Sequence, residues 1–155
     1  MSQRHSEYDR IAGDTYVTPR WVYEALYTVE PWAEDAFEAA PVDYKHDFFS
    51  LPRVNDDICT NPPFRLAEKF VRHALKMADR VAMLLPMNWD AAKTRRDLFE
   101  NPRFRAKYVI TKRIRWENLA QKKNGPSTNH AWFVWDKPTD MVPFIGYLPK
   151  QESPV

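Results

Sequence analysis

The sequence predicts an α/β protein with a mostly parallel sheet and helices on both faces. Two observations support this class. Apolar residues recur at helical spacing in two segments, and an apolar run of strand length, Arg80 to Pro86, follows the second segment. Helices that alternate with buried strands pack as layers around a sheet. The length of 155 residues fits one domain spanning residues 1–155, with flexible ends at 1–13 and 149–155.

The first helix is expected to begin near Thr18 and to end at about Tyr27. Thr18 is a favourable N-cap residue, and Pro19 suits the first helical position. The next segment, residues 29–49, shows no clear helical or strand period. A short strand over residues 56–60 is expected to follow it.

The stretch that organises the chain is Asn61-Pro62-Pro63-Phe64. The prolines fix φ near −65° and donate no backbone hydrogen bond, so the preceding strand has to end there. A helix from Leu66 to Ala78 is expected next, because its apolar residues share one face. A stiff turn at the carboxyl end of a strand is where open α/β sheets place their ligands.

The remaining elements are read from residue type and period. Arg80 to Pro86 predicts a buried parallel strand, and residues 90–99 predict a short helix. Lys107 to Thr111 predicts another strand. The aromatic run His130 to Trp135 predicts a strong strand, and Val142 to Leu148 an edge strand.

The composition narrows the functional classes. Lys and Arg number 23 against 21 Asp and Glu, and a net charge of +2 neither demands nor excludes a nucleic-acid partner. The single cysteine, Cys59, excludes an internal disulfide and fits a reducing cytoplasm. No apolar run approaches the length of about 18 residues that a membrane span needs. We therefore expect a cytoplasmic protein without a membrane span. The four histidines are scattered and no zinc spacing occurs, so no metal site is expected.

The chemistry of the turn suits a flat amine. The side-chain carbonyl of Asn61 and the backbone carbonyl of Pro62 are two acceptors held close together. They match the two hydrogens of a planar NH2 group, and the ring of Phe64 can stack on a planar base beside it. Orienting and polarising such an amine favours its attack on an electrophile.

Asn61-Pro62-Pro63-Phe64 resembles the catalytic motif of amino-methyltransferases. Members of that family use S-adenosylmethionine and methylate adenine in DNA, amines in RNA or a glutamine in protein. The resemblance covers roughly Tyr16 to Lys137. It implies that these four residues are catalytic and that the fold is a trimmed, Rossmann-like methyltransferase fold.

The resemblance also implies where the methyl donor binds. A Tyr/Phe-x-Thr-Pro segment precedes the first helix in this family, which places Tyr16 and Thr18 near the donor. Two alignments of the next segment stay open. In one, Glu30 is a stub of the Gly-rich donor loop and Asp47-Phe48 lies near the donor's adenine. In the other, Asp35 lies in an acidic stretch similar to that of phage-type adenine methyltransferases, which lack the loop. The chain has only 3 glycines, Gly13, Gly125 and Gly146, so no G-x-G turn for a nucleotide can form between Ala12 and Gly125.

A basic aromatic segment is the candidate nucleic-acid contact. Lys112, Arg113, Arg115 and Trp116 combine cations for phosphates with a ring for stacking. A solvated loop is the plain alternative. We therefore expect a DNA adenine-N6 methyltransferase that uses S-adenosylmethionine and contacts DNA. The alternatives are a non-catalytic methyltransferase-like protein that binds nucleic acid or another subunit, and an enzyme acting on RNA or protein.

Overall fold

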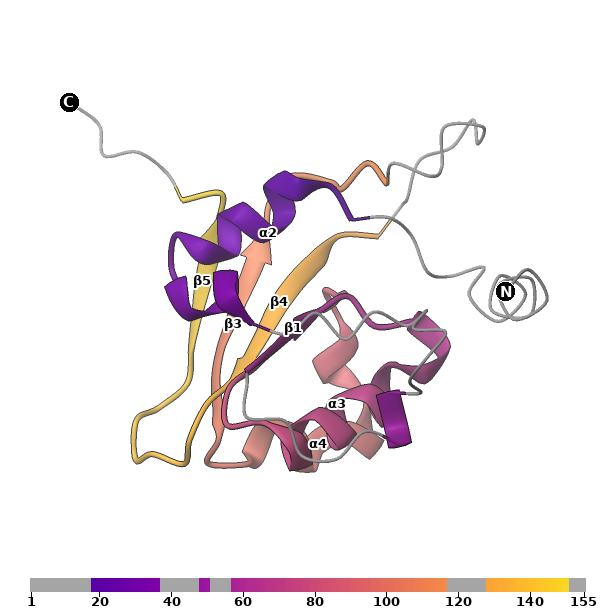
Figure 1. The fold of residues 1–155 in the computed structure, drawn as a ribbon, viewed down its shortest axis with the longest axis vertical. Helices are drawn as coiled ribbons and strands as arrows, with labels where there is room; N and C mark the ends of the chain where they lie inside the picture. The colour runs from indigo at the N-terminus through magenta and orange to yellow at the C-terminus, as the bar shows by residue number, and fades with distance from the viewer. Residues whose placement is uncertain (1–17, 37–47, 51–56, 117–127, 151–155) are drawn as a thin grey trace.

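The fold is a five-stranded sheet with helices on both faces (Figure 1). The computed structural model describes residues 18–36, 48–50, 57–116 and 128–150. The strands in these residues are β1 (Ile58–Thr60), β2 (Val81–Pro86), β3 (Phe104–Ile110), β4 (His130–Trp135) and β5 (Phe144–Leu148). They lie in the order β1-β2-β4-β3-β5. The predicted α/β class is therefore confirmed.

The sheet is mixed, which corrects the prediction of a mostly parallel one. β1 pairs with β2 in parallel and β3 pairs with β5 in parallel, whereas β4 is antiparallel to both β2 and β3. Four strands thus share one direction, and β4 runs against them from inside the sheet. The sequence does not reveal this, because a strand buried on both faces shows the same continuous apolar run in either direction.

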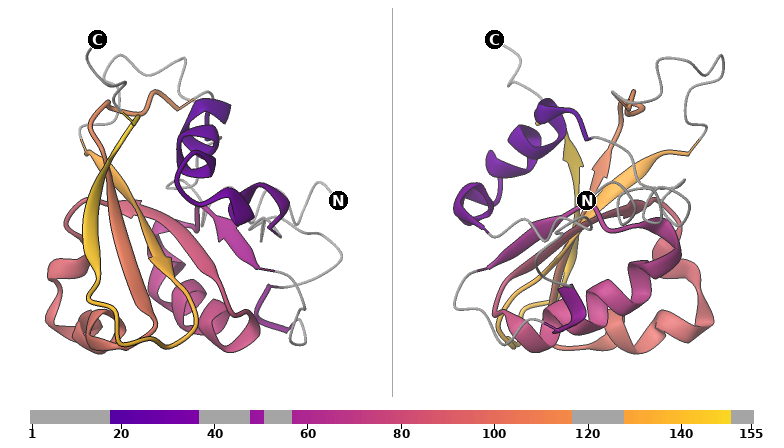
Figure 2. Two further views of the ribbon diagram at one scale, coloured as in Figure 1. Left: turned by 90° about the vertical axis from the view of Figure 1, so that its left-hand side faces the viewer. Right: turned by 45° about the vertical axis from the view of Figure 1, so that its right-hand side comes forward.

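The helices divide between the two faces, as the views in Figure 2 show. The helix α2 (Arg20–Tyr27) and the 3-10 helix η1 (Pro31–Asp35) cover one face, which we call the α2 face. The helices α3 (Ala67–Met77) and α4 (Arg96–Glu100) cover the other, the α3 face. Side chains alternate along β4, so that Trp132 packs on the α2 face and Phe133 on the α3 face.

Buried tryptophans of β4 fasten a helix to each face. The indole Nε1 of Trp132 donates to the carbonyl of Val22 in α2 at 3.0 Å. The indole Nε1 of Trp135 donates to the carbonyl of Leu98 in α4 at 2.9 Å. Both tryptophan side chains are fully buried, so these hydrogen bonds satisfy donors that would otherwise be costly inside the core.

Most element boundaries lie within a residue or two of the predicted ones, with two notable differences. The helix predicted for residues 90–99 is broken into η4 (Trp89–Ala91), η5 (Lys93–Arg95) and the short α4. β3 begins at Phe104, three residues before the predicted start, because Phe104 pairs with Trp135 at the end of β4. The arm predicted for residues 1–13 lies outside the described residues.

Candidate functional site

The Asn-Pro-Pro-Phe turn has the predicted place at the carboxyl end of β1. It leads into the 3-10 helix η3 (Phe64–Leu66) and then into α3. Pro62 and Pro63 are buried and Asn61 is half-buried, while Phe64 is 57% exposed. The two prolines therefore pack in the interior, and the ring of Phe64 is exposed to solvent.

The side chain of Asn61 is oriented by Thr18. The amide nitrogen Nδ2 of Asn61 donates a hydrogen bond to the hydroxyl Oγ1 of Thr18 at 2.9 Å. This contact corrects the prediction that Thr18 caps α2: Pro19 is the N-cap residue, and no side-chain hydrogen bond caps the helix. The Thr18 hydroxyl accepts a hydrogen bond from the Asn61 amide instead. Because the NH2 group of Asn61 faces Thr18, the carbonyl oxygen Oδ1 faces away from Thr18. Oδ1 is therefore suited to accept a hydrogen bond from a ligand.

Strand directions bring several segments to the same edge as Asn61. The carboxyl ends of β1, β2 and β3 and the amino end of β4 all lie there. Just beyond β2, the backbone N–H of Met87 donates to the carbonyl of Asn129 at 2.9 Å, which closes this edge between β2 and β4. We call this the carboxyl edge. A ligand bound at the turn after β1 lies at this edge.

His130, the first residue of β4, is a polar residue of the carboxyl edge that the sequence reasoning did not select. Its Nδ1 lies 3.1 Å from the carbonyl of Thr128, and its ring meets the ring of Trp116 edge-on at 5.1 Å. Burial of the ring lowers the pKa of His130 to about 4, so the imidazole is neutral at pH 7. A carbonyl only accepts, so Nδ1 carries the proton and Nε2 is an acceptor. The sequence shows a histidine at the start of a predicted strand, but it does not show that this strand is antiparallel and therefore begins at the carboxyl edge.

Among the predicted donor residues that the structure describes, Thr18 is the one with a hydrogen bond to Asn61. The two carboxylate oxygens of Glu30 accept hydrogen bonds from the Tyr108 hydroxyl and from Nε1 of Trp32, the latter at 2.7 Å. Burial of Tyr108, and then its hydrogen bond to Glu30, raise the pKa of that hydroxyl well above its usual value, so it stays a donor. Glu30 thus ties η1 to β3, three strands away from β1 in the sheet.

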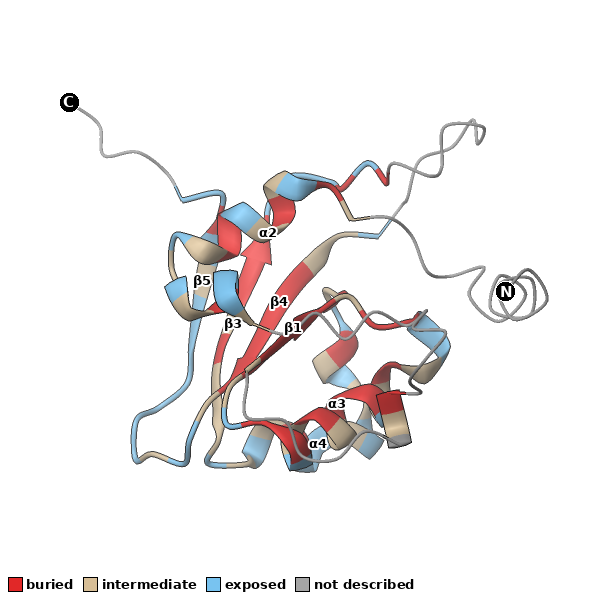
Figure 3. Ribbon diagram, in the orientation of Figure 1, coloured by how far each residue is buried: buried red, intermediate tan, exposed pale blue. Residues whose placement is uncertain are grey.

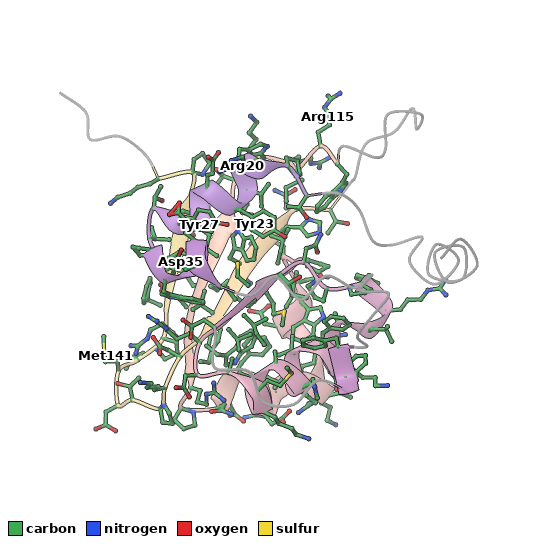
Figure 4. All side chains as sticks on the ribbon, viewed as in Figure 1. Arg20, Tyr23, Tyr27, Asp35, Arg115 and Met141 are labelled. Carbon is green, nitrogen blue, oxygen red and sulfur yellow. The ribbon has the colours of Figure 1, made fainter. Side chains whose placement is uncertain are left out.

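The other predicted donor residues lie elsewhere or outside the described part of the chain. Phe48 opens the 3-10 helix η2 (Phe48–Ser50), is buried, and stacks on Phe70 of α3 with ring centroids 4.4 Å apart. It therefore belongs to the core of the α3 face. Asp35 is exposed at the end of η1, as Figure 4 shows. Tyr16 and Asp47 lie outside the described residues.

The basic segment after β3 alternates between solvent and core. Lys112, Arg113 and Arg115 are exposed, whereas Trp116 is buried against the α2 face. Trp116 therefore packs under the segment rather than exposing its ring for stacking. The ammonium of Lys112 lies over the ring of Trp21 in α2, 5.1 Å from its centre. Figure 4 shows Arg20 and Arg115 at the same end of the molecule, both pointing outward.

No known protein family matches this sequence, and no curated protein is similar to it. Across the described part of the chain, no helix has the length and apolar character needed to cross a membrane.

Proposed function

We propose that this protein is an S-adenosylmethionine-dependent methyltransferase that acts on the exocyclic amine of adenine in DNA. The observation that carries the proposal is the Asn61–Phe64 turn at the carboxyl end of β1, with the Asn61 amide oriented by Thr18 and the Phe64 ring exposed. We assign the chain a trimmed, Rossmann-like methyltransferase fold. The helices on both faces and the four strands that share one direction support this assignment.

In the proposed mechanism the turn holds the amine by both hydrogens. Oδ1 of Asn61 and the carbonyl oxygen of Pro62 each accept one N–H, and Phe64 stacks on the adenine. This arrangement aims the nitrogen lone pair and stabilises the positive charge that develops on nitrogen during attack. The adenine has to leave its stack in DNA to reach the turn. The donor would supply an electrophilic methyl group: its methyl–sulfur bond would break as the nitrogen–carbon bond forms, the sulfonium would leave as a neutral thioether, and the methylated amine would then release its proton to water.

The described residues offer the donor a limited set of contacts. Thr18 lies beside Asn61, so a donor that reaches the amine also passes this hydroxyl. Glu30 and Phe48 are already engaged in the packing of η1 and of the α3 face. With few contacts and no Gly-rich loop, we expect weak binding, with a Kd of about 10 μM to 1 mM, equivalent to roughly −7 to −4 kcal/mol.

The basic residues beyond β3 give the nucleic acid a second point of contact. In the order β1-β2-β4-β3 the ends of β1 and β3 are three strand spacings apart, or about 14 Å. At about 3.4 Å per phosphate along one strand, this corresponds to roughly four nucleotides. An adenine at Asn61 would thus have phosphates within reach of Lys112, Arg113 and Arg115.

The deciding experiment is transfer of a tritiated methyl group to mixed genomic DNA by the wild type and by Asn61→Ala. Removing one preorganised polar contact at a reacting centre lowers the rate about 10²- to 10³-fold. Asn88→Ala is the matched control, because Asn88 is an exposed asparagine after the neighbouring strand β2 and caps no helix with its side chain. Near-normal transfer by Asn61→Ala would end the catalytic assignment of the turn.

The nucleic-acid contact has its own test. Arg113→Ala is expected to weaken DNA binding and to reduce the log–log salt slope by about 0.9 for each phosphate that the arginine no longer neutralises. Fluorescence anisotropy over a range of salt concentrations measures both quantities. Arg96→Ala, an exposed arginine on α4, is the control and should leave the slope unchanged. If Arg113→Ala also leaves it unchanged, the segment is only a solvated loop.

A second candidate is a non-catalytic relative that binds nucleic acid or another subunit. It is favoured by the engagement of Glu30 and Phe48 in structural contacts. Calorimetry with S-adenosylmethionine, with and without a DNA duplex, separates the candidates. Heat of binding in either titration supports the enzyme. The absence of heat at millimolar donor, both with and without DNA, supports the non-catalytic protein. RNA and protein in the same transfer assay test the other substrate classes.

A further inference from the structure

Exposed apolar side chains concentrate along β5, at the sheet edge opposite β1. Among the described residues, six large hydrophobic side chains are exposed, and all except Phe64 lie between positions 141 and 147. They are Met141 (63%), Val142 (82%), Phe144 (46%), Ile145 (61%) and Tyr147 (63%). The side view of Figure 2 shows β5 as the outermost strand, and Figure 3 shows the exposure of the loop that leads into it.

The backbone of β5 is also open to a further strand. The carbonyl of Leu148 accepts from the N–H of Thr111 at 2.9 Å, so Leu148 turns its backbone polar groups toward the β3 side. In a parallel strand every second residue directs its N–H and C=O groups to the same side, so Phe144 and Gly146 also face β3. The N–H and C=O groups of Ile145 and Tyr147 face away from β3. The strand sequence Phe-Ile-Gly-Tyr-Leu contains no charged residue or proline, the features that normally protect an edge from pairing.

We propose that β5 pairs antiparallel with β5 of a second copy of this chain, about a two-fold axis at Ile145. In this register Ile145 lies opposite Ile145 of the second copy, where the outward N–H and C=O groups exchange two hydrogen bonds. Two-fold pairing is the commonest way in which identical chains associate. The pairing joins the two sheets and leaves β1, with its turn, at the far edge of each copy.

Charge and shape along the strand select the second copy as the occupant. A register centred on position 145 brings the segment before β5, which holds Asp140, toward the segment after β5 of the second copy, which holds Lys150, at both ends of the interface, and both residues are exposed. It also sets Phe144 opposite Gly146, so that a large ring lies beside a residue without a side chain. Pro143 has no N–H, but its carbonyl can accept from Tyr147 of the second copy, and the ladder stops there.

The oligomeric state tests the proposal. Light scattering coupled to size exclusion should give the wild type twice the mass of one chain, and Ile145→Lys the mass of one chain, because that change places two ammonium groups opposite each other. Phe64→Lys is the matched control, since it replaces another exposed large hydrophobic residue, one that lies away from β5, and should remain dimeric. Circular dichroism establishes that each variant is folded. A wild type that stays monomeric at all accessible concentrations overturns the proposal.

Cysteine cross-linking tests the register. Cys59 is buried, so Ile145→Cys introduces an accessible thiol that a short bismaleimide should link to its counterpart in the second copy. In Val142→Cys the two thiols would be six residues apart along the strands, or about 20 Å, and should not be linked. Asp140→Lys should weaken the dimer, and adding Lys150→Asp should restore it. Faster linkage of Val142→Cys than of Ile145→Cys, or no rescue by the second change, would overturn this register.

Discussion

Arg103 holds the carboxyl end of α3 against the sheet, at the end of the sheet opposite Asn61, and its removal is a sharp test of how this helix is anchored. Its Nη1 donates to the carbonyl of Leu75 at 2.6 Å, and its Nη2 to the carbonyls of Ala78 and Asp79 at 2.8 and 2.9 Å. Its Nε donates to the carbonyl of Asp136 at 2.9 Å, just after β4. The carbonyl of Leu75 is among the last four of the helix, which have no partner within it.

The expected cost of Arg103→Ala follows from these contacts. A hydrogen bond to a charged group contributes about 1.5–3 kcal/mol when it is protected from water. A cation at a helix carboxyl end adds about 0.3–1 kcal/mol. Because Arg103 is only half-buried, water replaces part of these interactions, so we expect Arg103→Ala to lower the free energy of unfolding by about 2–4 kcal/mol. Arg103→Lys keeps the charge without the planar fork and should cost roughly half as much.

Urea unfolding followed by circular dichroism measures these differences. Arg96→Ala is the control, because Arg96 is exposed and its salt bridge in the described part of the chain is with Glu100, one turn away on α4, at 3.1 Å. Such a pair contributes at most about 0.5 kcal/mol. The reasoning is refuted if Arg103→Ala shifts the midpoint no more than Arg96→Ala, with equal slopes in both curves.

Three further predictions concern the sheet and the turn. Gly146→Ala should lower the free energy of unfolding by about 1–3 kcal/mol in a thermal melt, because an added Cβ would lie 2.8 Å from Cδ1 of Tyr108. The pKa of His130 is lowered from 6.5 to about 4, so between these pH values the unfolded chain binds a proton that the folded chain does not. The free energy of unfolding should therefore fall by up to about 3 kcal/mol as the pH drops through this range. Urea titrations at each pH measure this fall, which should be absent in His130→Gln. Thr18→Val should reduce methyl transfer by roughly 2- to 10-fold through loss of a neutral hydrogen bond of about 0.5–1.5 kcal/mol to Asn61, and Thr18→Ser should restore it; equal rates in all three proteins would contradict the orienting role.

The elements with strong periodicity were predictable from the sequence. α2, α3, β2 and β4 match their predictions closely, because each buries a face that its apolar residues define. The cap of α2 was mispredicted for a reason that local sequence does not contain. Thr18 is a good cap by residue type, but its hydroxyl accepts from Asn61, 43 positions further along the chain.

The candidate site was predictable in part. The turn at Asn61 follows from two prolines after a strand. The resemblance placed Thr18 near the methyl donor, and the structure shows Thr18 in hydrogen-bond contact with Asn61. Glu30 accepts one hydrogen bond from Trp32, two positions away, and the other from Tyr108, 78 positions away; nothing local to Glu30 indicates the second. The burial of Trp116 did have a local signal, because Arg113-Ile114-Arg115-Trp116 alternates polar and apolar residues as a half-buried extended segment does.

Asn61 and Phe48, which the sequence analysis placed in one site, lie on opposite faces of the sheet. Asn61 meets Thr18, which leads into α2, and the neighbouring ring contact on this face joins Tyr23 of α2 to Trp132 of β4 at 5.4 Å. Phe48 lies on the other face, stacked on α3. In the proposed reaction, a donor at an amine held by Asn61 would lie on the α2 face, near Thr18 and the aromatic side chains of α2 rather than near Phe48. On this reasoning, substitutions in the amino-terminal half of α2 should affect donor binding more than substitutions around Phe48, which should act through stability.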